Sequence, residues 1–99
     1  MKLDFTKLVN DFDGNPVHDN NGTPITMLVV ATMSLTGQLP GEPFDGAKAF
    51  ERGRLLERIY ANRTGVDLTV EERAEIQSRC GKMYSMGVVY PFFKFIEGE

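Results

Sequence analysis

A chain of 99 residues fits a single domain, 1–99, because a second hydrophobic core would be too small to stand alone. Apolar residues make up 41% and charged residues 25%, a balance that excludes disorder caused by low hydrophobicity and high net charge. The net charge of −3 lacks the global positive field typical of nucleic-acid-binding proteins, and a single cysteine excludes an intrachain disulfide framework.

The N-terminal residues 1–22 have the pattern of a short β-hairpin or an extended arm. Leu3 and Phe5 alternate with polar residues, as in a strand. The sequence DGNP at 13–16 favours a turn, since glycine tolerates positive φ and proline fixes its own φ. Val17 begins a short return, which a second turn at 19–22 closes.

Residues 25–35 are apolar on all sides and form the most buried element of the predicted fold. Thr23 as N-cap and Pro24 at the first helical position favour a helix, whereas the β-branched residues of the segment favour a strand. We predict a helix and keep the strand as the alternative. The Gly- and Pro-rich residues 36–46 form a loop that is long for so small a domain, and long loops are often functional.

Two amphipathic helices are expected after this loop. The first runs from about 47 to 62, with an apolar face made by Ala49, Gly53, Leu56 and Tyr60 and widened by Phe50, Leu55 and Ile59. The second begins after Thr69, which has the spacing of a capping box with Glu72. Its predicted inward residues are Val70, Ala74, Ile76, Cys80 and Met83.

The C-terminal residues 85–96 are strongly apolar, and Pro91 predicts a short or kinked helix that ends near Glu97. The expected fold is therefore α+β and mainly α. A small bundle of three to four helices over 23–97, with the loop at 36–46, follows the N-terminal hairpin or arm.

No set of residues predicts catalysis or metal binding. His18 lies in a polar loop and Cys80 on the inward side of a helix, where cysteine behaves as a small hydrophobe, so a Cys–His nucleophile pair is not expected. Two such residues do not complete a zinc site, which takes about four ligands. The spacing of Asp11 and Asp13 is typical of an EF-hand, but Pro16 stands where that loop needs glycine. We predict a protein that is not an enzyme and has no cofactor.

A cluster of basic residues on the predicted helix 47–62 is the first candidate binding surface. Arg52, Arg54 and Arg58 are suited to carboxylates or phosphates, because the planar guanidinium group donates two hydrogen bonds at once. Interleaved glutamates weaken the positive field and commonly pair with arginine on exposed helices. A solvated surface, an acidic protein partner and nucleic acid are all compatible with this pattern.

The second candidate surface is the C-terminal segment. Phe92, Phe93 and Phe95 lie so close in sequence that one helix face cannot cover all three. They either pack in the core or form an apolar patch that meets a partner protein or a second copy of the chain.

Several short motifs together resemble a group of short proteins carried by tailed bacteriophages and prophages. These motifs are DGNP at 13–16, TPIT at 23–26, LLERIY at 55–60, VDLT at 66–69 with Glu71 and Glu72, GKMY at 81–84 and EGE at 97–99. The resemblance implies an α-rich fold and an accessory protein that binds a host or phage protein in the bacterial cytoplasm. A nucleic-acid-associated regulator using the basic residues and a homo-oligomeric assembly protein are the alternatives.

Overall fold

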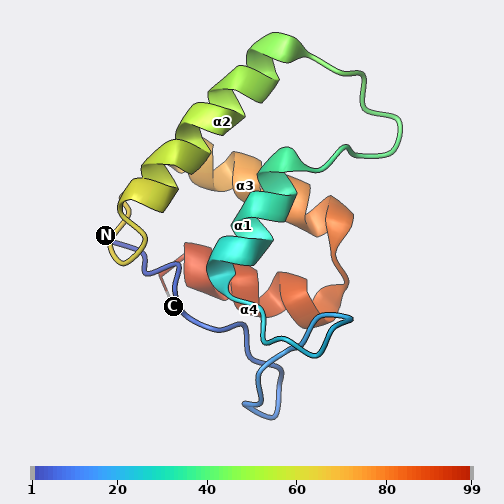
Figure 1. Cartoon of the computed structure of the whole chain (residues 1–99), viewed down its shortest axis with the longest axis vertical. Coiled ribbons are helices and arrows are strands. Elements are labelled where there is room, and N and C mark those ends of the chain that lie inside the picture. Colours follow the sequence, from blue (N-terminus) through green and yellow to red (C-terminus); the bar gives the residue numbers. More distant parts are fainter. Residues whose placement is uncertain (1, 99) are drawn as a thin grey trace.

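The computed structural model describes residues 2–98 and has four helices (Figure 1). They are α1 (Met27–Thr36), α2 (Gly46–Ala61), α3 (Val70–Met83) and α4 (Met86–Ile96). Helix α1 packs against both α2 and α3, and α4 packs against α3. The small helical bundle is confirmed, and residues 27–35 are helical, so the strand alternative for that segment is wrong.

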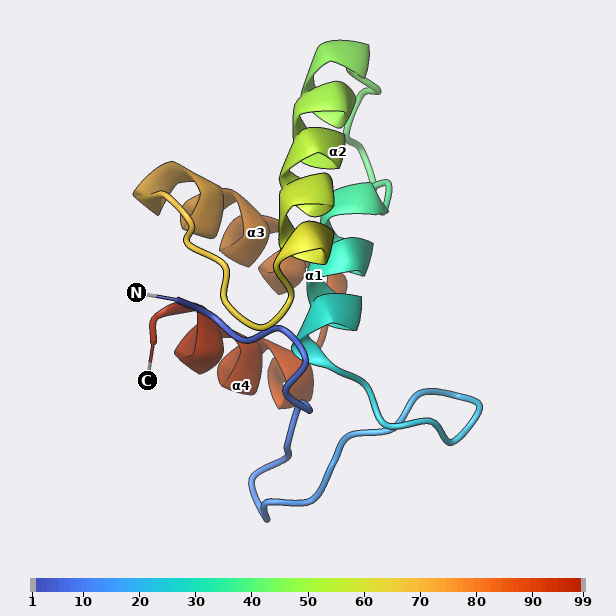
Figure 2. The ribbon, with the colours of Figure 1, turned by 60° about the vertical axis from the view of Figure 1, so that its left-hand side comes forward.

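The N-terminal segment is an extended arm, and the predicted hairpin is not formed as a strand ladder. Between residues 2 and 26 the β-type pairs are isolated bridges, two of which join Asn10 to Pro16 and His18 to Pro24. Because proline has no N–H to donate, neither bridge can grow into a regular ladder. The arm still doubles back on itself, since Val17 N donates to Val9 O at 2.8 Å and Ile25 N donates to Val17 O at 2.9 Å. Figure 2 shows it extending below the helices.

Helix α1 begins three residues later than Thr23 and Pro24 predict. The bridge at Pro24 and the hydrogen bond from Ile25 N hold this part of the chain extended. Thr26 is the actual N-cap, and its hydroxyl accepts from Val29 N at 3.2 Å. Tertiary contacts with the arm therefore move the helix start to the next residue that can cap it.

Local signals place the starts of α2 and α3. Asp45 caps α2 by accepting from Ala47 N at 3.0 Å. The predicted capping box of α3 is confirmed: Glu72 N donates to the Thr69 hydroxyl at 3.1 Å, and Thr69 N donates to the Glu72 carboxylate at 2.9 Å. Each arrangement satisfies N–H groups that have no partner inside the helix.

Helix α4 continues through Pro91 and has Glu97 as its C-cap. The proline removes one main-chain hydrogen bond, which an N–H at position 91 would donate to the carbonyl of Gly87. The apolar face of the helix compensates, because Val88, Phe92, Phe95 and Ile96 are all buried. The helix therefore owes its stability to packing.

The arm and α4 build one end of the core together. The ring of Phe5 lies edge-on to Phe95 at a centroid distance of 5.0 Å, and Phe92 lies 6.1 Å from Phe95. Both Phe5 and Phe92 have no exposed surface. Edge-to-face aromatic contacts add to the free energy gained by burying the rings.

Helix α2 is much less embedded than its predicted apolar face suggests. Only Leu55 and Ile59 are buried, while Tyr60 is 40% exposed and Gly53 is also on the surface. The first half of the helix, up to residue 54, contains no buried residue. In Figure 2 this half projects beyond the other helices.

Helix α3 also differs from its predicted inward face. Ile76 and Cys80 are buried as expected, but Val70 is 67% exposed and Ala74 lies on the surface. Arg79 is also buried, although it was not among the predicted inward residues. Its guanidinium group contacts the end of α1 and the loop that follows it.

Candidate functional site

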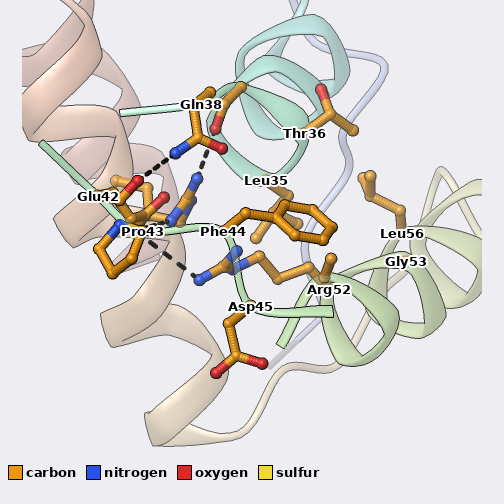
Figure 3. Close-up of a pocket in the computed structure, with 13 residues that line it drawn as sticks. Leu35, Thr36, Gln38, Glu42, Pro43, Phe44, Asp45, Arg52, Gly53 and Leu56 are labelled. Carbon is orange, nitrogen blue, oxygen red and sulfur yellow. Dashed lines mark hydrogen bonds and ion pairs between the residues drawn. The ribbon is translucent and has the colours of Figure 1, made fainter. Parts of the chain in front are cut away.

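A groove of about 250 Å³ lies between the C-terminal end of α1 and the N-terminal half of α2, beside the loop that joins them (Figure 3). Its apolar lining includes Leu35, Phe44 and Leu56. Its charged lining includes Glu42, Asp45, Arg52 and Arg79. The groove combines an apolar surface with a few polar groups, as small binding sites usually do.

Arg79 is 5% exposed and ties α3 to the end of α1. Its Nε donates to the carbonyl oxygen of Ser34 at 2.6 Å, and its Nη2 donates to that of Gly37 at 2.6 Å. The last carbonyls of a helix have no partner inside the helix and carry its negative dipole end, so a cation suits this place. Arg79 thus closes α1 and fixes the start of the loop.

The loop is anchored through Glu42. Its carboxylate accepts from Arg79 Nη1 at 2.8 Å and lies 4.0 Å from Arg52 Nη2. The hydrogen bond from Arg79 lowers the pKa of Glu42, against a smaller opposing effect of desolvation. The main chain of Glu42 is also held, since its carbonyl accepts from the Gln38 side chain and its N–H donates to Leu39 O at 3.1 Å.

Phe44 follows this anchored segment and is 79% exposed. Figure 3 shows its ring among the residues that line the groove, near Leu35 and Arg52 in that view, and its high exposure places it at the opening. At Gly53 an added Cβ would meet no atom within 4 Å, so the groove is open along α2. An anchored loop therefore presents a large apolar side chain beside unfilled space.

The outer side of α2 is a different surface from the groove. Ala49, Arg52, Gly53 and Leu56 line the groove. A second row at spacings of three and four residues points away from it, and all of its members are exposed: Ala47, Phe50, Arg54, Glu57 and Ala61. We refer to these five residues as the outer row. Phe50 is 62% exposed, and the Arg54 guanidinium lies 4.9 Å from its ring centroid.

The structure does not gather the three predicted arginines on one free surface. Arg52 Nε donates to Glu75 at 2.8 Å, and the Arg52 side chain is 17% exposed. Arg58 donates to the Glu72 carboxylate at 2.5 Å, which lowers the pKa of Glu72 and raises that of Arg58. Within residues 2–98, Arg54 alone of the three has no ion-pair partner.

The predicted C-terminal phenylalanines lie mostly inside. Phe92 is fully buried, Phe95 is 9% exposed and Phe93 is half-buried. Apolar surface is exposed elsewhere, at Phe44 and Phe50 and also at Phe12, whose ring lies 5.3 Å from that of Tyr90. Phe44 stands in the predicted loop, between Pro43 and Asp45, and this position was a sequence signal for an exposed ring. The Phe-rich C-terminal segment was chosen as the candidate surface instead.

The possible reactive residues are placed apart from the groove. Cys80 is fully buried, and burial raises the pKa of its thiol to about 11, so the thiol is protonated at neutral pH. His18 is exposed on the arm. In the part of the chain that the structure describes, no three His, Cys, Asp or Glu side chains are grouped so as to hold a metal ion.

Comparison with known proteins gives no relative: no family model, no curated protein and no solved structure matches the chain. The phage origin implied by the sequence motifs therefore stays a prediction. Over residues 2–98, no helix has both the length and the apolar composition that crossing a bilayer requires.

Proposed function

We propose that this chain is a non-enzymatic accessory protein that acts by binding another protein at the groove between α1 and α2. The observation that carries the proposal is Phe44, 79% exposed at the opening of an unfilled groove. Burying a phenylalanine side chain is worth roughly 1.5–3 kcal/mol, which makes an exposed one a strong anchor for a partner. Aromatic residues are enriched in the buried centres of protein interfaces.

The anchored loop supports this role. Arg79 and Gln38 hold Glu42, so the main chain that leads to Phe44 is ordered before any partner arrives. Ordering a loop on binding costs free energy, and a loop that is already ordered avoids that cost. Phe44 and the open stretch at Gly53 then offer a partner both a protruding side chain and a place for one of its own.

The charges favour a protein over a nucleic acid as the partner. Arg79 and Arg52 at the groove are paired with Glu42 and Glu75, so their charge is already compensated. Nucleic-acid binding needs several cations that are free to contact phosphates. The net charge of −3 acts in the same direction.

The resemblance to phage proteins directs the search for the partner to bacterial and phage proteins in the bacterial cytoplasm. The test is a pull-down from bacterial lysate with quantitative mass spectrometry, comparing wild type with two groove variants. Phe44→Ser removes the anchor, and Gly53→Leu fills the open stretch. Phe12→Ser is the matched control, since Phe12 is 70% exposed and is not among the residues that line the groove.

We expect a protein that wild type and Phe12→Ser retain and that both groove variants lose. A partner that binds all four proteins equally would contradict the proposal. So would a partner that only Phe12→Ser fails to retain, because this result would place binding on the arm.

A further inference from the structure

The outer row of α2 is a helical surface that the rest of the chain leaves uncovered. The helix has 16 residues but buries only Leu55 and Ile59. Most helical stability in proteins comes from packing of an apolar face, and α2 packs only a small part of its surface within the chain. The exposed Phe50 within this row adds apolar surface that the bundle does not use.

The outer row repeats at spacings of three and four residues, which is the spacing of helix-pairing surfaces. Two successive members of the row have opposite charges, Arg54 and Glu57. Neither has an ion-pair partner within residues 2–98, although the other arginines of α2 are paired. Small alanines stand at both ends of the row, at 47 and 61.

We infer that a second copy of this chain covers the outer row, with the two α2 helices packed antiparallel about a two-fold axis. The axis passes midway between positions 54 and 57, so that Arg54 of each copy faces Glu57 of the other. Phe50 of each copy then faces Ala61 of the other, whose small side chain leaves room for the ring. A two-fold interface uses the same surface on both subunits, so the surface must be complementary to itself.

Charge complementarity selects this partner. With antiparallel helices and the axis midway between positions 54 and 57, Arg54 meets Glu57 in two symmetric contacts and Phe50 meets Ala61 in two more. Ala47 lies outside these pairs. The inference goes beyond the proposed function, because the groove residues and the outer row lie on different sides of α2.

Sedimentation velocity over a range of protein concentrations tests the inference without any unidentified partner. Wild type is expected to shift with concentration from the 11.1 kDa monomer toward twice that mass. Arg54→Glu and Glu57→Arg each replace two attractive contacts with two repulsive ones. Each variant should weaken self-association by roughly ten- to a hundredfold, since exposed ion pairs contribute about 0.2–1 kcal/mol each.

The decisive experiment mixes these two variants. Each variant alone brings like charges together across the axis, whereas a mixed dimer pairs the introduced glutamate with the introduced arginine and the native Arg54 with the native Glu57. An equimolar mixture should therefore dimerise. The double variant carrying both Arg54→Glu and Glu57→Arg should recover wild-type association. Lys48→Glu is the matched control, because it makes the same change in net charge as Arg54→Glu at an exposed position of α2 outside the row.

Three results would overturn the inference: a wild-type protein that stays monomeric at its highest soluble concentration, a single variant that associates as strongly as wild type, or a mixture that remains monomeric. None of them bears on the groove, which the pull-down tests separately. Far-UV circular dichroism of each variant verifies that the fold is kept.

Discussion

Helix α4 and the N-terminal half of α2 both belong to segments rich in phenylalanine, but only α4 has a cover for its rings. Phe95 is buried against Phe5 of the arm, and Phe92 is buried beside Phe95. Phe44 and Phe50 are 79% and 62% exposed. The difference shows that the exposure of a phenylalanine ring depends on which segment packs against its helix. The segment that packs on α4 is the arm, from the opposite end of the chain.

The largest expected change in the free energy of unfolding is at α4, where the phenylalanine rings are buried. Phe92→Ala removes a ring with no exposed surface and should lower the free energy of unfolding by about 3–5 kcal/mol, through lost burial and the cavity left behind. Phe50→Ala should change it by less than about 0.5 kcal/mol in dilute solution, because the ring is already largely in water. Urea unfolding of both variants measures the two stability losses, and equal losses would contradict the contrast between α4 and α2.

The second effect concerns how the loop is held. Arg79→Met removes three donated hydrogen bonds and leaves the carbonyls of Ser34 and Gly37 without their partner. The expected loss of unfolding free energy is about 2–4 kcal/mol. Arg54→Met is the control, with no loss beyond about 0.5 kcal/mol, because Arg54 is exposed. A stable Arg79→Met variant would mean that the loop is ordered by other contacts.

A smaller effect compares the starts of α3 and α4. The hydroxyl of Thr69 accepts a hydrogen bond from Glu72 N, whereas Ser85 at the start of α4 makes no side-chain capping bond. Thr69→Ala should therefore cost about 1 kcal/mol, and Ser85→Ala should cost only a few tenths of a kcal/mol. Thermal unfolding of the two variants under identical conditions gives the comparison. A larger loss at Ser85 would contradict the assignment of the caps.

The smallest expected effect is a pH dependence from Glu72. The hydrogen bond from Arg58 lowers its pKa in the folded protein below the ordinary value of 4.5. The ionised pair therefore stabilises the fold above that value, and this stabilisation is lost as the pH falls through the lowered pKa. Glu72→Gln should be less stable than wild type at neutral pH, and the gap should shrink on acidification. Urea unfolding at several pH values measures this difference in the free energy of unfolding. A difference that grows as the pH falls would contradict the prediction.

Features that depend on neighbouring residues were predictable from the sequence. The capping box of Thr69 and Glu72 needs only the right spacing, and it forms as predicted. The start of α1 was not predictable in this way, because Thr23 has the residue type of a cap but Pro24 is held by the arm. A contact between segments overrides a local preference where the two compete.

The candidate site was harder to predict, because it depends on long-range packing. Arg79 lies between Ile76 and Cys80 in an inward stripe of α3, and a charged residue in such a stripe indicates a buried partner. Its acceptors lie 37 to 45 residues away in sequence, so only the structure identifies them. The exposure of Phe44 likewise depends on the loop that Arg79 anchors.

Hydrogen exchange at a low and a high protein concentration tests most directly whether α4 is covered within the chain and residues 50–54 of α2 only by a second molecule. The main-chain amides of residues 92–96 should exchange slowly at both concentrations. Those of residues 50–54 should exchange fast in the dilute protein and more slowly in the concentrated one. Amides of α4 that exchange as fast as those of α2 in the dilute protein would contradict the account.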